Sequence, residues 1–280
     1  MGIILIGERI NGSFKDVGRA IQEHDKTVIR DRVARQEAGG ADYLDVNMGA
    51  ASRKLEDYAW LVQATAESTA LPLSLDCPRA DMFRVGLKAY RDTVGERAVI
   101  LNSTTAEDSK LIPLLELASE YKAGIIGVVM DERGSPQDVD RRLELGGKIF
   151  AAAVEAGIPT TQIYLDPIVM PVKFMQDQPK NVLNAIQQMT MLSDPPPHIS
   201  IGLSNISSKT EERKLINRTF MVMAMAMGVD AAILDVCDEE LRQAVATAEL
   251  LLGMEIYSDA YLKAYRQRAG FGTAAAAAAA

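Results

Sequence analysis

Short apolar runs alternate with longer amphipathic segments along almost the whole chain. The runs are nearly continuous in apolar residues, a pattern typical of strands that are buried on both faces of a parallel sheet. The segments between them repeat apolar residues at helical spacing and end at glycines such as Gly39 and Gly157. We predict strands at residues 3–6, 43–47, 73–76, 99–102, 125–130, 163–166, 199–203 and 231–234. We predict helices at residues 27–38, 55–68, 81–90, 108–121, 138–156, 182–191, 219–228 and 239–252.

Successive strand–helix units of this kind favour an α/β protein with a (β/α)8 TIM barrel over an open, doubly wound sheet. The 280-residue chain is long enough for such a barrel, and no linker or change of composition divides it. We therefore expect residues 1–267 to form one barrel domain. The final segment, residues 268–280, ends in a run of alanines, and we expect it to be a disordered tail or a remnant that is foreign to the domain.

Composition narrows the class of protein. The chain is 48% hydrophobic and 24% charged, which suits a large globular domain, and its net charge of −8 disfavours nucleic-acid binding. Two cysteines are too few for a disulfide framework. The N-terminus lacks the basic region of a secretory signal, and no apolar run reaches the roughly 18 residues of a membrane helix. We expect a cytoplasmic protein that binds neither nucleic acid nor membrane.

Candidate chemistry lies where the predicted strands end. Four of them end on a carboxylate or amide residue, and these residues are Asp76, Asn102, Asp166 and Asn205. A fifth strand carries Asp45 and Asn47. The carboxyl ends of barrel strands form the mouth of the active site, and carboxylates with amides suit a neutral heterocycle rich in N–H groups, such as an aminopyrimidinone. A phosphate site would need Lys, Arg or backbone amides. Taken singly, each Asp could instead cap the following helix.

Other polar features have simpler interpretations. Residues 8–12 are interpreted as a charged turn after the first strand, and residues 211–214 as a solvated loop. Cys77 adjoins Asp76, but no histidine is placed beside it, so a small core residue is expected rather than a nucleophile. His198 precedes its strand and therefore lies at the wrong end of the barrel for catalysis. The strand ends offer no His/Cys set at ligand spacing, so we predict that no metal is bound directly.

Six short segments occur in order along the chain. They are Ile6-Gly7-Glu8-Arg9-Ile10-Asn11-Gly12, Leu75-Asp76, Leu101-Asn102-Ser103-Thr104, Leu165-Asp166-Pro167, Gly202-Leu203-Ser204-Asn205 and Ile216-Asn217-Arg218-Thr219-Phe220. Together they resemble the methyltetrahydrofolate:corrinoid methyltransferase family, which comprises pterin-binding barrels related to the folate domain of cobalamin-dependent methionine synthase. The resemblance covers residues 2–265.

This resemblance implies a dihydropteroate-synthase-like barrel, a homodimer, and a reduced folate bound at the strand ends. By position, the pyrimidine edge of the pterin is expected at Asp76, Asn102 and Asp166. Asn205 is then expected near N5, the nitrogen that bears the methyl group. The remaining expected folate contacts are Gly202 and Ser204 at the floor of the pocket, Arg213 at the folate tail, and Asp45.

The implied reaction moves a methyl group between N5 of 5-methyltetrahydrofolate and the cobalt of a corrinoid (cobalamin), in either direction. The route would be the acetyl-CoA pathway or the second methyltransferase of a demethylation system. The chain lacks the cobalt-ligating Asp-x-His-x-x-Gly motif, so we expect the corrinoid on a partner such as a corrinoid/iron–sulfur protein. Because N5 is a poor leaving group, it needs a proton or a strong hydrogen bond. We assign this catalytic role to Asn205, assisted by water and by Asp45 or Asp166.

Two alternatives stay open. A dihydropteroate-synthase-like enzyme shares the barrel, but the basic residues of that family on the last strands are missing, since the eighth run here ends in Asp235 and Val236. A folate-binding module without turnover would keep the same pocket. A methyl-exchange assay separates both alternatives from the transferase.

Overall fold

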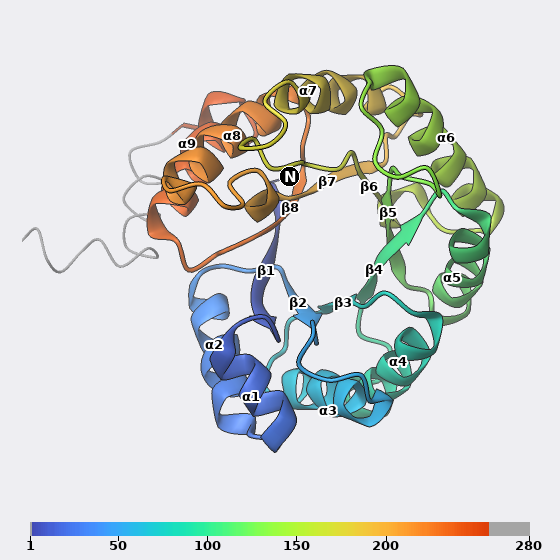
Figure 1. The fold of residues 1–280 in the computed structure, drawn as a ribbon, viewed down its shortest axis with the longest axis vertical. Coiled ribbons are helices and arrows are strands. Elements are labelled where there is room, and N and C mark those ends of the chain that lie inside the picture. The colour runs from blue at the N-terminus through green and yellow to red at the C-terminus, as the bar shows by residue number, and fades with distance from the viewer. Residues whose placement is uncertain (1, 258–280) are drawn as a thin grey trace, which may run out of the picture.

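The computed structural model describes residues 2–257, so the predicted end of the domain at residue 267 and the predicted tail lie outside the described residues. Parallel strands close into a barrel in the order β1 to β8 with helices around it (Figure 1), which confirms the predicted (β/α)8 fold. The strands are β1 (Ile4–Asn11), β2 (Tyr43–Asn47), β3 (Leu73–Asp76), β4 (Val99–Thr105), β5 (Gly124–Val128), β6 (Ile163–Asp166), β7 (His198–Gly202) and β8 (Ala231–Leu234).

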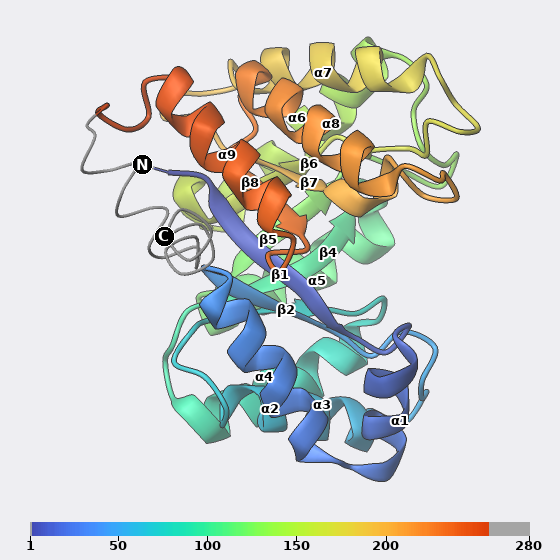
Figure 2. The ribbon, with the colours of Figure 1, turned by 90° about the vertical axis from the view of Figure 1, so that its left-hand side faces the viewer.

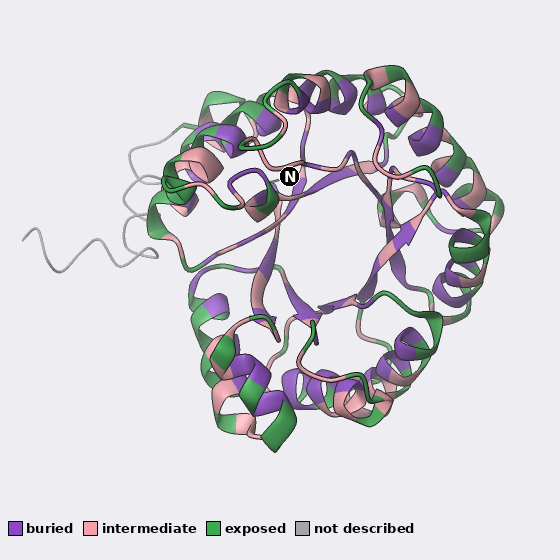
Figure 3. Cartoon of the chain, viewed as in Figure 1, coloured by how far each residue is buried: buried purple, intermediate pink, exposed green. Residues whose placement is uncertain are grey.

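The barrel is surrounded by nine described α-helices and two short 3-10 helices. The α-helices are α1 (Lys15–Glu23), α2 (Lys26–Ala38), α3 (Leu55–Ala66), α4 (Ala80–Val94), α5 (Asp108–Tyr121), α6 (Val139–Glu155), α7 (Gln178–Met189), α8 (Arg213–Met227) and α9 (Glu239–Leu251). The 3-10 helices are η1 (Thr160–Gln162) and η2 (Leu203–Asn205). Their buried faces turn toward the strands and their exposed faces toward solvent (Figure 3). None of the helices in residues 2–257 is long and apolar enough to cross a bilayer.

Side chains that point into the barrel lie in layers, and the layer at the carboxyl ends of the strands forms its mouth. A small apolar cluster fills the interior, and its buried members are Ile6, Ile100, Ile126, Tyr164 and Ala231. Side chains of a strand alternate between its two faces, so the residue two positions further along points into the same interior. This rule places Glu8, Asn102 and Asp166 in the next layer of the interior, at the carboxyl ends of β1, β4 and β6.

The structure differs from the sequence prediction at the first strand. β1 does not stop at Ile6 but continues to Asn11, after an irregularity in its register with β2 between Gly7 and Ile10. Residues 8–11 are therefore strand, and their interpretation as a turn is wrong. β1 pairs with both β2 and β8 and so closes the barrel, and Figure 2 shows it lying between α9 and α2. The charges at residues 8 and 9 hid this strand because a buried strand is expected to be apolar.

Two helical segments also differ from the prediction. Helix α1 was not predicted, although its buried residues, which include Val17, Ala20 and Ile21, follow the spacing of an amphipathic helix. Helix α8 begins at Arg213 rather than at residue 219, so Arg213 and the residues after it lie on the helix and not in a loop. The last strand-like residue of β7 is Gly202, and the chain then turns directly into η2.

Candidate active site

A row of amides and a carboxylate crosses the mouth of the barrel. Asn11, Asn47, Asp76 and Asn102 are successive register partners on β1, β2, β3 and β4. Within this row the amide Nδ2 of Asn47 donates a hydrogen bond to Oδ2 of Asp76 at 2.5 Å. The structure thus brings together the predicted Asn47, Asp76 and Asn102 and adds Asn11 to them.

Asp45 supports this row from below. Its side chain is buried, and its Oδ1 accepts hydrogen bonds from Ser74 Oγ at 2.7 Å and from Asn102 Nδ2 at 3.1 Å. Burial, followed by the negative charge of nearby Asp76, raises the pKa of Asp45 well above its usual range. Asp45 therefore lies behind Asn102, and its hydrogen bond fixes the orientation of the amide.

Asp76 and Asp166, the two carboxylates at strand ends, both have a raised pKa. Burial raises the pKa of Asp76 and that of Asp166 to about 6. The hydrogen bond from Asn47 lowers the pKa of Asp76, and backbone hydrogen bonds from Ile168 and Gly202 lower that of Asp166, but burial outweighs them. No ion pair with Lys, Arg or His engages either carboxylate within residues 2–257. Both groups are thus poised to accept hydrogen bonds from a ligand.

Asp166 also orders the loop that follows β6. Its Oδ1 accepts a hydrogen bond from the backbone N–H of Ile168 at 2.8 Å. Ile168 has φ 61°, a left-handed conformation that is costly for a β-branched residue and that surrounding structure must stabilise. Asp166 therefore closes a turn of the loop but caps no helix, since the next helix, α7, begins at Gln178.

Two cavities open among the segments that follow the strands. The first, of ≈ 470 Å³, is lined by residues that include Asn47, Asp76, Cys77, Met82, Ser103 and Lys110. The second, of ≈ 480 Å³, is lined by residues that include Glu8, Asn11, Ser204, Asn205, Arg213 and Asn217. Each has the size of a small-molecule site. Of the predicted residues, Asp76 lines the first cavity, and Ser204, Asn205 and Arg213 line the second. The two cavities adjoin where β1 pairs with β2 through Asn11 and Asn47.

Glu8 is a site residue that the sequence interpretation missed. It is partly buried, and its Oε1 accepts a hydrogen bond from Ser204 Oγ at 2.7 Å. Burial raises the pKa of Glu8, although the hydrogen bond from Ser204 lowers it. The alternation Ile4, Ile6, Glu8 along β1 would have identified it as the inward-facing residue at the mouth.

The predicted Asn205 and Arg213 both line the second cavity. Asn205 is exposed and ends η2, one residue after Ser204. The guanidinium of Arg213 donates to two neutral oxygens, Oγ of Ser207 and the carbonyl oxygen of Ser204, each at 3.3 Å. Its positive charge faces the cavity without a carboxylate at ion-pair distance among the described residues. The prediction of a loop at residues 211–214 is wrong for Arg213 and Lys214, which begin α8 and line the cavity, whereas their predicted solvent exposure is confirmed.

Cys77 and His198 lie where the sequence interpretation placed them. Cys77 is buried beside Asp76, and burial raises the pKa of its thiol to about 12, so the nucleophilic thiolate is disfavoured. His198 begins β7 at the opposite end of the barrel, where its Nδ1 pairs with Asp230 at 2.7 Å. Among the residues that the structure describes, no group of three or more His, Cys, Asp or Glu side chains could hold a metal ion.

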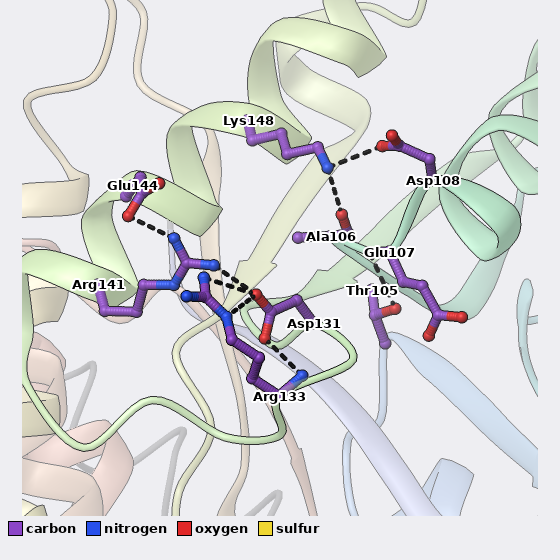
Figure 4. Close-up of polar contacts among 9 residues, drawn as sticks. All are labelled: Thr105, Ala106, Glu107, Asp108, Asp131, Arg133, Arg141, Glu144 and Lys148. Atoms are coloured by element: carbon purple, nitrogen blue, oxygen red, sulfur yellow. Dashed lines mark hydrogen bonds and ion pairs between the residues drawn. The ribbon is translucent and has the colours of Figure 1, made fainter.

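The rim after β5 has a different kind of carboxylate (Figure 4). Asp131 is buried and pairs with Arg141 and, at 3.0 Å, with Arg133. Arg141 also reaches Glu144 at 2.5 Å. These contacts tie the segment after β5 to the first turn of α6.

Residues 7–235 match the family model for pterin binding enzymes. The chain belongs to the pterin-binding enzyme family. This enzyme is 30% identical over 268 residues to a methylcorrinoid:tetrahydrofolate methyltransferase of Eubacterium limosum, covering 95% of this chain and 97% of the relative. It is 26% identical over 245 residues to a methionine synthase of Mycobacterium leprae (strain TN), covering 82% of this chain and 20% of that protein. These matches confirm the family that the ordered motifs predicted.

The fold of this pterin-binding enzyme has solved counterparts. A dihydropteroate synthase of Xanthomonas albilineans, in complex with 7,8-dihydropteroate, matches it with a TM-score of 0.64 at 17% identity, over 90% of this chain and 94% of that one. This likeness concerns the barrel itself.

Proposed function

We propose that the enzyme transfers a methyl group between N5 of 5-methyltetrahydrofolate and the cobalt of a corrinoid that a separate protein carries. The observation that carries this proposal is the pair of carboxylates Asp76 and Asp166, which lack cationic partners among the described residues and lie with Asn102 at the barrel mouth. Such acceptors match the N–H donors of a pterin better than they match an anion. Near-full-length similarity to a methylcorrinoid:tetrahydrofolate methyltransferase supports the same substrate pair.

In this proposal the two cavities hold two ends of one folate. The pyrimidine edge binds at the first cavity, where Asp76 accepts its hydrogen bonds, and extends toward Asn102, the register partner of Asp76, and toward Asp166. Ser204, which lines the second cavity, and the nearby Gly202 are proposed as the floor of the pocket. Arg213 then faces the carboxylate tail, because its guanidinium is engaged only by neutral oxygens among the described residues.

Methyl transfer needs stabilisation of charge at N5 and alignment of the methyl group with the cobalt. Asn205 is exposed at the end of η2 and lines the second cavity, so its amide is available to orient a hydrogen bond to N5. The open mouth leaves the methyl group accessible to a corrinoid carried by a partner protein. We further propose that the enzyme acts as a homodimer in the cytoplasm and in either direction of transfer.

The test is methyl exchange between tetrahydrofolate and free methylcobalamin, followed in both directions by absorbance. Transfer in at least one direction is the expected result. Tight binding of tetrahydrofolate without transfer to any corrinoid would instead indicate a folate-binding module. Condensation of p-aminobenzoate with a pterin pyrophosphate would indicate a dihydropteroate-synthase-like enzyme.

A further inference from the structure

The second cavity contains one carboxyl group whose charge is not paired within the described residues. Three carboxyl groups line it, and they belong to Glu8, Asp235 and Asp238. Asp235 pairs with Arg9 at 3.4 Å. Asp238 pairs with Lys214 at 3.4 Å and caps α9 through the backbone N–H of Leu241. Glu8 accepts a hydrogen bond from a serine and takes part in no ion pair among residues 2–257.

The position of Glu8 is fixed from two sides. Strand β1 directs its side chain into the barrel interior, two residues beyond the buried Ile6. Ser204 of η2 donates to its Oε1 at 2.7 Å. Because Ser204 directly precedes Asn205, this hydrogen bond holds the carboxyl group next to the residue that is proposed to face N5.

We propose that Glu8 is a further catalytic residue, the acid that gives a proton to N5 of methyltetrahydrofolate, and that Ser204 is the residue that positions it. This inference rests on the proposed function. It supplies the group that the chemistry requires, since neither His nor Lys is placed at the predicted strand ends, and an amide such as Asn205 is too weak an acid to protonate an amine.

Protons and electrons balance in the proposed methyl transfer. The O–H bond of the Glu8 carboxyl group breaks and an N5–H bond forms, which leaves a carboxylate and a protonated amine. The electron pair of Co(I) then forms the Co–C bond, the C–N5 bond breaks with its pair staying on nitrogen, and cobalt becomes Co(III). The products are methyl-Co(III), tetrahydrofolate with N5–H, and Glu8 carboxylate, which regains a proton from solvent. In the reverse direction the carboxylate accepts the proton.

The surroundings of Glu8 both raise and lower the pKa of its carboxyl group. Burial and the carboxylate of Asp235 raise the pKa of Glu8, whereas Ser204, Arg9 and Arg213 lower it, and the net effect is a raised pKa. The protonated form is therefore available at a higher pH than for an exposed glutamate. Since the acid must be protonated to act, the rate of transfer to Co(I) should fall as the pH rises through this pKa.

The experiment compares Glu8→Gln with the wild-type protein and with Asp235→Asn, which removes an ion-paired carboxylate from the same cavity. Single-turnover transfer from methyltetrahydrofolate to free cob(I)alamin is measured by stopped flow between pH 5 and pH 8, and methyltetrahydrofolate affinity by calorimetry. We expect Glu8→Gln to lower the rate by about a hundred-fold or more, to flatten its pH dependence, and to change the affinity only a few-fold. Asp235→Asn should keep a pH-dependent limb like that of the wild type but move it to lower pH, because a carboxylate that raises the pKa of Glu8 is lost.

A second variant tests the positioning residue. In Ser204→Ala the transfer rate should still fall with rising pH, but the fall should move to higher pH. The reason is that the hydrogen bond that lowers the pKa of Glu8 is lost. Thermal melts of all variants verify that each is folded. Wild-type rate and pH profile in Glu8→Gln would overturn the role of Glu8 while leaving the proposed function intact. Loss of affinity with an unchanged saturated rate would make Glu8 a binding residue instead. If the wild-type protein transfers no methyl group, the proposed function itself fails.

Discussion

Two kinds of buried carboxylate lie on the same side of this barrel. Asp131 is contacted by the guanidinium groups of Arg133 and Arg141, so its charge is balanced within the chain (Figure 4). Asp76 and Asp166 receive hydrogen bonds from an amide and from backbone N–H groups but pair with no cation among the described residues. A buried carboxylate that pairs with arginines can order a loop. A buried carboxylate without a cation carries an uncompensated desolvation cost, which hydrogen bonds from the N–H groups of a ligand can offset. From this comparison we expect Asp131 to be structural and Asp76 and Asp166 to be the functional carboxylates.

The largest effect is expected at a neutral residue of the mouth. Asn205→Ala should lower kcat by roughly ten- to a thousand-fold, the range for losing one preorganised donor, because its hydrogen bond strengthens as N5 loses the methyl group. Folate affinity should fall less than it does in Asp76→Ala. Stopped-flow kinetics and a thermal melt test this together. A folded variant with the wild-type single-turnover rate would contradict the catalytic role and favour a structural one.

Removing either functional carboxylate should weaken binding of methyltetrahydrofolate. Asp76→Ala and Asp166→Ala each leave pterin donors unpaired in a buried pocket, at a cost of about 1–3 kcal/mol in binding free energy. Calorimetry measures this, with Asp131→Ala as the matched control that should bind normally. Equal affinities in all three variants would remove the distinction between the two kinds of carboxylate.

The pH dependence of stability should follow the functional carboxylates. Their pKa of about 6 in the folded protein exceeds the usual value of 3.8, so the folded state holds more protons than the unfolded state between these values. The free energy of unfolding should therefore fall as the pH rises from about 4 to about 6, by on the order of 2 kcal/mol for each group. Urea titrations should show that Asp76→Asn gains stability relative to wild type at pH 7 but little at pH 4. An equal difference at both pH values would contradict the assigned pKa.

Replacing the balanced carboxylate should have a smaller and opposite effect. Asp131→Asn loses the two ion pairs that hold the segment after β5, so its Tm should fall by about 2–4 °C. Affinity for methyltetrahydrofolate should not change. A calorimetric scan beside a binding titration tests both statements. Loss of binding at an unchanged Tm would assign Asp131 to the site instead.

The smallest effect is expected from metal removal. Exhaustive chelation should leave methyl transfer to free cobalamin unchanged, since the predicted site uses carboxylates and amides as hydrogen-bonding groups. The control is the same assay after addition of zinc. Activity that chelation abolishes and zinc restores would contradict the prediction.

The apolar runs predicted the barrel and most of its inward strand ends. The predicted bounds of β2, β3, β6 and β8 are those of the structure, because each is a short apolar run that ends at a polar residue or a turn. The strand-end rule then placed Asp76, Asn102 and Asp166 at one mouth. The apolar pattern within each run does not determine the register between strands. This register brings Asn11 and Asn47 into the same row.

The missed features share a physical reason. They are Glu8 as a site residue and the place of Arg213 on a helix; both residues are charged, and a charged residue in a sequence is interpreted as solvated unless the fold surrounds it. Glu8 lies within a strand that tertiary pairing extends past an irregularity, and Arg213 lies in the first turn of a helix whose apolar face begins later. Both depend on contacts between distant segments, which local periodicity does not contain.

The hydrogen bond between Glu8 and Ser204 joins residues 196 positions apart. During synthesis, one half of the second cavity leaves the ribosome almost at the start of translation and the other half near the end. Loop closure over this distance costs entropy that only the fully paired barrel repays. A nascent chain thus carries the first cavity, built from β2, β3, β4 and β5, well before it carries the second. The proposed folate site is complete only when β1 meets β8, so its assembly would coincide with completion of the fold.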